Sequence, residues 1–447
     1  MILKSNVFPP FKTLPVIWPV LLCLMISACS SRPKLPSPEQ QAEKLAQALD
    51  DSGYKPTRDF EISSVNDIWR HDQVELEVAM IAPTKPGAYP LIIYLPSLGE
   101  DVKAGRLWRE NWAKAGYAVF SIQPVSISQA LKDLGPQRGG SPMNSDDSLD
   151  DQSIEAKADD SDDSITKDRR RSLRMARDSD LRYLGHQYFA VEALKNRMDQ
   201  LFWAYQQLKI KAGMKQSLYG SADVSKVILA GYDLGAQTVT AVLGENFNTT
   251  LPNSIELKPL AAIVLSPSID LAEGNARNRF QALNLPILVI TGSEDNDPYA
   301  ISSASVRTGL WEDSPSGDKY LLLLKGGGHR LLSGSGIFSH FDRGETGGLE
   351  SRRHGGLDAA GQLNEFSNQF GGHGRNQQNS NDEGMLAWGS GNKEADKGER
   401  AYKQVAAVIS TTLAFLDVVF KKDEFARFWL RENANIWLDK TGSIKVR

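Results

Sequence analysis

The sequence predicts an α/β protein with a mostly parallel, doubly wound sheet and helices on both faces. Three observations support this prediction. Short apolar segments of strand composition alternate with longer segments of helical spacing from about residue 55 to 330. The segment PLIIYLP at 90–96 is continuously apolar, as a strand buried on both faces is. With 447 residues, the chain is long enough to form one large domain with insertions.

Strands and helices are predicted in alternation along the chain. The first strands are FEISSV (60–65), QVELEVAMIAP (73–83) and PLIIYLP (90–96), and the second of them alternates between apolar and polar residues. The remaining strands are expected at 117–124, 226–232, 260–266, 286–292 and 319–326. Helices are expected at 107–116, at 186–208, from about 234, and from about 400 to 438. This alternation is typical of a mostly parallel sheet that is covered on both faces.

Two segments, 136–182 and 333–398, do not fit this pattern. The first passes from an acidic block at 146–163 to the basic run KDRRRSLRMAR, and the second is rich in Gly, Asn, Ser and His. Neither has enough apolar surface to offset the entropy that ordering would cost. Both are therefore expected to be disordered or, for the first, self-paired on the surface. The alternative for the first insertion is a binding role toward anionic lipid or a protein partner.

The N-terminal segment has the composition of a signal peptide. Lys4 and Lys12 precede the apolar run VIWPVLLCLMI, which is too short for a permanent transmembrane helix. The residues that follow, Ile-Ser-Ala-Cys, resemble the lipobox of bacterial lipoproteins, and the resemblance implies that Cys29 carries the lipid. Ser30, rather than Asp, follows this cysteine, which in such proteins favours the outer membrane, facing the periplasm. An ordinary signal peptide and an uncleaved anchor are the alternatives.

The N-terminal prediction divides the chain into three parts. Residues 1–28 are expected to be removed as a lipoprotein signal peptide. Residues 29–54 are expected to form a Pro/Ser-rich lipidated tether and a short helix, since Leu45, Ala48 and Leu49 have helical spacing. The folded domain is expected to occupy residues 55–447 and to contain both insertions.

Charge and residue content argue against two classes of function. The chain has 51 Lys+Arg and 55 Asp+Glu, so it lacks the basic footprint of a nucleic-acid-binding protein. His340, His354 and His373 have spacings that do not suit one another as metal ligands, and Cys29 would be the one cysteine left after processing. No metal and no other cofactor is therefore expected.

Three predicted strands are followed by residues that can carry chemistry. Gly231-Tyr232-Asp233-Leu234-Gly235 joins a strand to a helix in the pattern G-x-nucleophile-x-G, in which small residues allow a strained turn. The predicted strand at 286–292 is followed by Asp295 and Asp297, and the one at 319–326 by His329. Because the carboxyl ends of parallel strands meet at one edge of a sheet, we expect Asp233, one of the two acids and His329 to converge there.

These motifs lie in a chain that resembles the α/β-hydrolases of the dienelactone hydrolase and platelet-activating-factor acetylhydrolase type. The resemblance covers about 55–332 and the closing helices. PLIIYLPSLGE, a helix and KAGYAVFSIQP are similar to that group's strand, His-Gly-Leu-Gly-like turn, helix and strand, although the turn here reads Pro-Ser-Leu-Gly. The resemblance implies the α/β-hydrolase fold, with Asp295 orienting His329 as the base.

The same resemblance assigns the remaining site residues. It implies that the backbone N–H groups of Leu98 and Leu234 form an oxyanion hole. Asp233 takes the position of the nucleophile, and no G-x-S-x-G motif occurs in the chain, so the serine esterase mechanism is excluded. A carboxylate can instead attack carbon to form an ester that histidine-activated water hydrolyses, a scheme similar to that of haloalkane dehalogenases and epoxide hydrolases.

Two hypotheses of function follow from Asp233. In the first, the protein is an envelope-anchored hydrolase that acts on a small or lipid-like ester, epoxide or related substrate. In the second, it is a catalytically silent lipoprotein of the same fold that binds a ligand or a partner in the same pocket. A carboxylate at this position tends to keep the imidazole of His329 protonated, and a cationic histidine cannot act as a base.

Overall fold

The structure is a computed structural model that describes residues 37–50, 53–134, 162–215, 217–334 and 390–447. The chain divides into two units, residues 1–43 and 44–447. The strands and all the described candidate site residues lie in the second unit. The predictions for 1–28 and for Cys29 lie outside the described residues.

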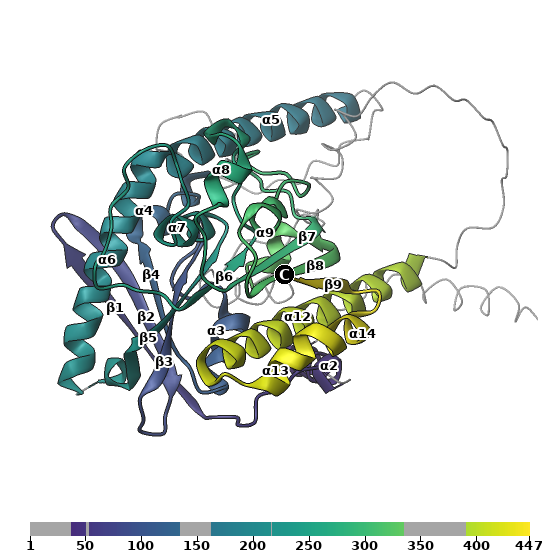
Figure 1. Ribbon diagram of the computed structural model, residues 1–447. Coiled ribbons are helices and arrows are strands. Elements are labelled where there is room, and N and C mark those ends of the chain that lie inside the picture. Colours follow the sequence, from purple (N-terminus) through teal and green to yellow (C-terminus); the bar gives the residue numbers. More distant parts are fainter. Residues whose placement is uncertain (1–36, 51–52, 135–161, 216, 335–389) are drawn as a thin grey trace, which may run out of the picture. The chain divides into compact units, whose positions relative to one another are not determined.

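A nine-stranded sheet forms the centre of the larger unit (Figure 1), in the order β1-β2-β4-β3-β5-β6-β7-β8-β9. The five pairs that link β4, β3, β5, β6, β7 and β8 are parallel, and the three pairs at the edges are antiparallel. The predicted α/β class with a mostly parallel sheet is therefore confirmed. The strands are β1 (Ile62–His71), β2 (Val74–Pro83), β3 (Tyr89–Leu95), β4 (Ala118–Pro124), β5 (Ala222–Tyr232), β6 (Ala261–Leu265), β7 (Ile287–Glu294), β8 (Lys319–Gly328) and β9 (Gly442–Val446).

Helices cover both faces of the sheet, because side chains that alternate along each buried strand need an apolar partner on either side. In β3, Ile92 and Tyr94 belong to one hydrophobic cluster, while Leu91 and Ile93 belong to the other. The first cluster includes residues of α3 (Arg106–Lys114) and of the C-terminal helices α12 (Ser390–Lys421), α13 (Glu424–Phe428) and α14 (Ala434–Leu438). The second includes residues of α6 (Val191–Met214), α7 (Leu234–Val242), α8 (Ala276–Phe280) and α9 (Gly309–Asp313).

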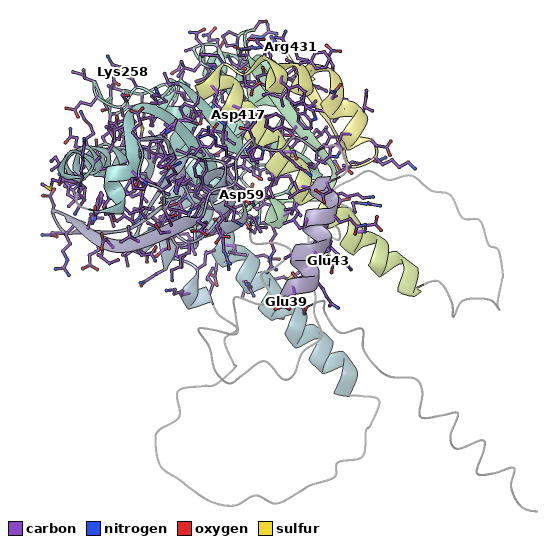
Figure 2. All side chains as sticks on the ribbon, turned by 90° about the horizontal axis from the view of Figure 1, so that it is seen from below. Glu39, Glu43, Asp59, Lys258, Asp417 and Arg431 are labelled. Carbon is purple, nitrogen blue, oxygen red and sulfur yellow. The ribbon has the colours of Figure 1, made fainter. Side chains whose placement is uncertain are left out.

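Helix α12 is the central element of the first face. Its stretch Glu399–Lys421 is long and apolar enough to cross a membrane, the one such helix in the described part of the chain. Most of this stretch is buried inside the protein, as in the core helix of an α/β fold. It also carries the buried Asp417, which is labelled in Figure 2. The carboxylate of Asp417 accepts a hydrogen bond from Tyr54 at 2.7 Å.

The prediction of a disordered insertion at 136–182 is wrong for residues 162–182. These residues form the first part of α5 (Asp162–Phe189), while 135–161 lie outside the described residues. The run KDRRRSLRMAR contains good helix formers and neither Gly nor Pro, and acidic residues precede it, as the helix dipole favours. The charge pattern that suggested disorder is therefore compatible with an exposed helix.

The helix that was predicted as one element at 186–208 is two helices. α5 ends at Phe189 and α6 begins at Val191, with Ala190 between them at φ −58° and ψ 149°. The last carbonyls of α5 find tertiary partners, since Arg197 Nη1 donates to Tyr188 O at 2.5 Å and Gln237 Nε2 donates to Phe189 O at 2.9 Å. No local sequence signal marks this break.

Three further details of the fold differ from the sequence prediction or extend it. α12 begins at Ser390, inside the second predicted insertion, most of which (335–389) lies outside the described residues. β9 was not predicted, and it pairs antiparallel with β8 at the end of the chain. The remaining short helices are α4 (Val125–Ser128) and α10 (His329–Leu332), and α2 (Pro38–Asp50) precedes the sheet.

Candidate active site

Asp233 occupies a strained turn between β5 and α7. Its φ of 51° and ψ of −105° are unusual for a residue that carries a side chain. The glycines on either side make this turn possible. A Cβ atom at Gly235 would lie 2.0 Å from the carbonyl oxygen of Leu95, and one at Gly231 would lie 2.5 Å from the carbonyl carbon of Gly235. The strand and the helix therefore pass too closely for any larger residue.

The structure brings Asp233, Asp295 and His329 together. His329 Nδ1 lies 2.7 Å from Asp295 Oδ1, and His329 Nε2 lies 3.7 Å from Asp233 Oδ2. The three residues come from the ends of β5, β7 and β8, which belong to the parallel run β5-β6-β7-β8 of the sheet. All three are buried, and Asp233 is only 1% exposed. The imidazole thus lies between two carboxylates.

Of the two candidate acids, Asp295 is the one that contacts the imidazole. Its carboxylate also accepts hydrogen bonds from Ser266 Oγ at 2.7 and 2.9 Å and from Thr291 Oγ1 at 2.7 Å. Asp297 instead accepts the backbone N–H groups of Tyr299, Ile301 and Ser302, so it holds its own loop in place. Asp295 is therefore fixed in an orientation that holds His329.

Arg307 supports both acids and was not found from the sequence. Its guanidinium is fully buried and lies 3.4 Å from Asp295 Oδ1 and 3.4 Å from Asp297 Oδ2. It also donates to the backbone carbonyls of Asp295, Ser266 and Pro267 at 2.6 to 2.9 Å. Burial acts to raise the pKa of Asp295, but Arg307 and the hydrogen bond with His329 lower it to about 2. Asp295 is thus kept ionised.

His329 is protonated in the resting site at neutral pH. Burial acts to lower its pKa, but the charges of Asp233 and Asp295 and their hydrogen bonds raise it to about 9. The strongest single contribution that raises it is the charge of Asp233. The expectation that a carboxylate at the turn protonates the imidazole therefore agrees with the direction of this pKa shift.

Ser97, in the turn after β3, makes the closest contact with Asp233. Its Oγ donates to Asp233 Oδ2 at 2.6 Å, and its backbone N–H donates to Glu100 Oε2 at 3.1 Å. Gln123 Nε2 donates to the carbonyl oxygens of Ser97 and Glu100 at 2.7 and 3.1 Å, which fixes the turn. The sequence singled out this turn, but it gave no sign that Ser97 contacts Asp233.

The two oxygens of Asp233 have different surroundings. Oδ2 accepts the hydroxyl of Ser97 and faces His329, whereas Oδ1 is buried and has no hydrogen-bond partner among the described residues. Nearby, burial raises the pKa of Glu100 to about 7, and the charge of Asp233 adds to this shift. The turn therefore presents one unpaired carboxylate oxygen.

The two predicted oxyanion-hole residues are Leu98, which follows Ser97 in the turn after β3, and Leu234, which directly follows Asp233. Both are buried, and they share a small apolar cluster with Ile127, Phe189 and Tyr299. Among the described residues, neither backbone N–H donates a hydrogen bond. Leu234 is also the first residue of α7, where helix N–H groups have no intrahelical acceptor. Both N–H groups are therefore open to an acceptor that enters the site.

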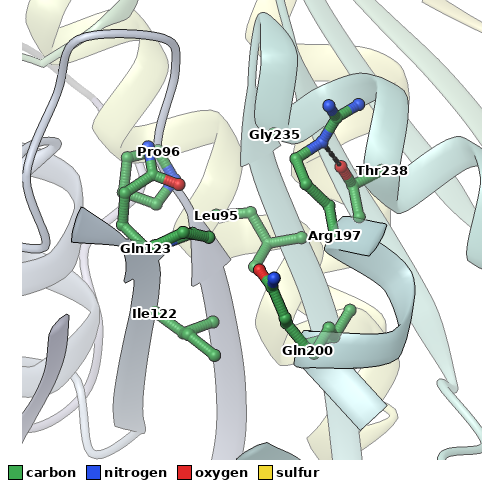
Figure 3. Close-up of a pocket in the computed structure, with 10 residues that line it drawn as sticks. Leu95, Pro96, Ile122, Gln123, Arg197, Gln200, Gly235 and Thr238 are labelled. Atoms are coloured by element: carbon green, nitrogen blue, oxygen red, sulfur yellow. Dashed lines mark hydrogen bonds between the residues drawn. The ribbon is translucent and has the colours of Figure 1, made fainter. Parts of the chain in front are cut away.

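A small cavity lies between the ends of β3 and β4 and the helices α6 and α7 (Figure 3). Its volume of about 20 Å³ is enough for one water molecule. Arg197 lines it and donates to Thr238 Oγ1 at 3.0 Å. Asp233, Asp295 and His329 are not among its lining residues, so this cavity is separate from the three converging side chains.

No group of three or more His, Cys, Asp or Glu side chains is placed to hold a metal ion in the described ranges. The chain matches no protein-family model, and no curated protein sequence matches it. The class that the structure defines is therefore an α/β protein with a buried Asp-His-Asp arrangement at the carboxyl edge of its sheet.

Proposed function

We propose that this protein is a hydrolase of the α/β-hydrolase fold in which Asp233 is the nucleophile. The observation that carries the proposal is Oδ1 of Asp233, which is buried at a strained turn and has no hydrogen-bond partner in the part of the chain that the structure describes. A buried carboxylate oxygen without a donor costs free energy, and sites of this kind are concentrated where a substrate group is to be met. The open N–H groups of Leu98 and Leu234 support the same assignment.

The first step of the proposed reaction is attack at carbon. Oδ1 of Asp233 forms a bond to an electrophilic carbon of the substrate, and the bond from that carbon to its leaving group or epoxide oxygen breaks. The electron pair of the broken bond stays with the leaving oxygen or halide. The product is an ester between Asp233 and the substrate carbon. The hydroxyl of Ser97 holds Oδ2 during this step, so that Oδ1 is the attacking atom.

The second step hydrolyses this ester. Ester formation removes the charge of Asp233, which is the main charge that raises the pKa of His329, so the imidazolium gives its proton to the departing group or to solvent. Neutral His329 then takes a proton from water, which attacks the ester carbonyl. The oxyanion accepts the N–H groups of Leu98 and Leu234. Its collapse breaks the bond to the substrate oxygen, which takes the proton of the new carboxyl group and leaves as an alcohol, so that Asp233 is again a carboxylate and His329 an imidazolium.

The surroundings of the site favour a small or lipid-like substrate, such as an alkyl ester, an epoxide or a related compound. The five buried residues next to the turn are apolar or aromatic: Leu98, Ile127, Phe189, Leu234 and Tyr299. They suit the hydrocarbon part of such a substrate.

A catalytically silent binding protein is the second candidate function. His329, whose pKa is raised to about 9, lies 3.7 Å from Asp233 Oδ2, and a protonated imidazole in the resting site favours a site that binds without turnover. A ligand bound beside Asp233 would then contact the apolar cluster without reacting.

One experiment separates these two functions. Wild type and His329→Gln are exposed to panels of esters, epoxides and haloalkanes and then measured by intact mass. We expect an adduct that maps to Asp233 and persists in His329→Gln, because the ester forms but its hydrolysis lacks a base. Asp233→Asn serves as the matched control and should remain unmodified. Absence of both adduct and turnover across the panels would overturn the hydrolase in favour of the binding protein.

We also propose that Cys29 anchors the protein by a lipid to the outer membrane, facing the periplasm. The supporting observation is the lipobox-like sequence at 26–29, with Ser30 after the cysteine. Cys29→Ala should leave the protein unlipidated, so that it is released from the membrane fraction or accumulates with its signal peptide. Unchanged processing and unchanged membrane fractionation would contradict the anchor.

A further inference from the structure

The helical segment 424–438 has an exposed apolar face. It is formed by α13, a π-helical turn (Trp429–Asn433) and α14. Phe425, Phe428 and Ile436 are 66%, 55% and 79% exposed, respectively. Their spacings of three and eight residues put the three side chains on one side of the segment. We call these three residues the C-terminal apolar face.

The opposite side of this segment is firmly packed. Ala426, Trp429, Leu430, Ala434 and Leu438 are buried in the hydrophobic cluster on this face of the sheet. The start of the segment is capped, because the side chain of Asp423 accepts the N–H groups that begin α13. The C-terminal apolar face is therefore held in place by a buried side and is not the result of a frayed end.

The N-terminal part of the larger unit packs beside this segment. Leu45 and Leu49 pack against the same hydrophobic cluster, and the ring of Tyr54 lies 6.3 Å from that of Phe425 and 5.8 Å from that of Trp429. The larger unit therefore begins next to the C-terminal apolar face. From Cys29 to Lys44 the chain spans at most about 50 Å, even when fully extended.

We propose that the C-terminal apolar face rests in the lipid surface that holds Cys29. A helix that lies in a membrane interface buries an apolar side among the lipids and keeps polar residues at its flanks. The C-terminal apolar face is flanked by four exposed basic residues: Lys421, Lys422, Arg431 and Lys440. Figure 2 shows Arg431 on these helices. Long basic side chains suit the headgroup region, since their stems stay in apolar surroundings while the charge reaches water and phosphate.

Apolar contact, rather than charge, provides most of the proposed binding. Three exposed acidic residues lie among the basic ones: Glu424, Glu432 and Asp439. The segment therefore has little net charge. Binding should therefore depend only weakly on anionic lipid and on salt, in contrast to a polybasic segment. The choice of a membrane as the partner rests on the proposed lipid anchor, but the binding test below does not use it.

The test uses the chain from Ser30 to Arg447, which lacks the lipid but contains every described residue. Its partition onto vesicles of phosphatidylethanolamine with one quarter phosphatidylglycerol is measured by flotation, and again on vesicles of phosphatidylcholine alone. The triple variant Phe425→Ser/Phe428→Ser/Ile436→Ser is compared with the control Ile210→Ser/Ile255→Ser/Leu271→Ser. The control residues are 53%, 85% and 65% exposed and lie on other elements.

We expect the triple variant to bind vesicles about tenfold more weakly than wild type, or more weakly still, because three large apolar side chains no longer enter the lipid. The control variant should bind as wild type does on both kinds of vesicle. Far-UV circular dichroism checks that both variants are folded. Bromine-labelled lipid should quench tryptophan fluorescence in wild type, and quenching should fall when Trp437, which neighbours the face, is replaced by Phe.

Three outcomes would overturn the proposal. The first is absence of vesicle binding by wild type, and the second is equal binding by the triple and control variants. The third is a wild-type dimer in light scattering that becomes a monomer in the triple variant, which would assign the face to a second copy of the chain. Because the assay involves neither turnover nor lipidation, its result is independent of the roles of Asp233 and Cys29.

Discussion

Two carboxylates face the same imidazole, and their surroundings are opposite. On one side of His329, the carboxylate of Asp295 accepts two hydroxyl groups and lies against the buried Arg307. On the other side, Asp233 receives one hydroxyl on Oδ2, and Oδ1 has no hydrogen-bond donor among the described residues. The hydrogen bonds and ion pair of Asp295 hold it in an orientation that positions the ring. Asp233 has one oxygen that no group in the described part of the chain pairs with.

The largest expected effect comes from removing the unsatisfied carboxylate. Asp233→Asn should abolish turnover of any substrate found in the mass-adduct panels, by about 10⁴-fold or more, as loss of a nucleophile does. The fold should persist, because an amide keeps the size and can still accept from Ser97. Turnover is measured with the best substrate, and unchanged turnover would show that Asp233 is not the nucleophile.

A serine at the same position sharpens this comparison. Asp233→Ser restores the hydroxyl that a histidine base needs, and it removes the charge that keeps His329 protonated. We expect measurable hydrolysis of activated aryl esters, since the N–H donors of Leu98 and Leu234 are open to an oxyanion. A folded Asp233→Ser protein without esterase activity would count against the oxyanion hole. Asp233→Ala is the matched control.

The contribution of the Asp295 side of the site can be tested by replacing Arg307. Arg307→Met removes the cation that pairs with both Asp295 and Asp297, which leaves His329 as the partner of Asp295 and removes the buried positive charge beside Asp297. We expect the free energy of unfolding to fall by about 3–5 kcal/mol, the usual cost of removing one partner of a buried ion pair. Urea unfolding at pH 7 measures this loss.

The control for this prediction is Arg277→Met, since Arg277 is exposed and its nearest carboxylate oxygen, on Asp313, is 3.9 Å away. Loss of an exposed pair should change stability little. Equal stability of the two variants would contradict the structural importance of the buried cation.

His329 and Asp295 should contribute to the stability of the protein in different pH ranges. The pKa of His329 is raised to about 9, against about 6.5 in an unfolded chain, so its contribution to stability is complete below about pH 6.5 and is lost toward pH 9. The pKa of Asp295 is lowered to about 2, so its contribution is present above about pH 4 and is lost as the pH falls toward 2.

Asp233→Asn separates these two ranges. The variant should lose most of the alkaline dependence, because the charge of Asp233 is the largest contribution that raises the pKa of His329. It should keep the acidic dependence that comes from Asp295. Urea unfolding between pH 2 and pH 9 gives both profiles, and an alkaline profile that the variant leaves unchanged would contradict the coupling between Asp233 and His329.

The sequence predicted the strained turn and its partners because those signals are local. Gly231 and Gly235 mark a close passage of strand and helix, and the residues after β7 and β8 have fixed positions along a parallel sheet. Arg307 and Ser97 reach the site from loops, without spacing or composition that marks them, so they could not be predicted. The break at Ala190 was missed for the same reason, since its compensating donors, Arg197 and Gln237, lie elsewhere in the chain.

The smallest expected effect concerns how the two oxygens of Asp233 differ. Ser97→Ala removes the hydroxyl that holds Oδ2, so Oδ2 keeps only its ion pair with His329 and the carboxylate gains rotational freedom. We expect the free energy of unfolding to change by only about 1 kcal/mol, as for one hydrogen bond. The rate of adduct formation should fall about ten- to a hundredfold with little change in KM, because orientation of the attacking atom is lost. Ser97→Thr keeps the hydroxyl and should restore most of the rate, whereas a purely structural role for Ser97 would leave the rate of adduct formation per folded molecule unchanged in both variants.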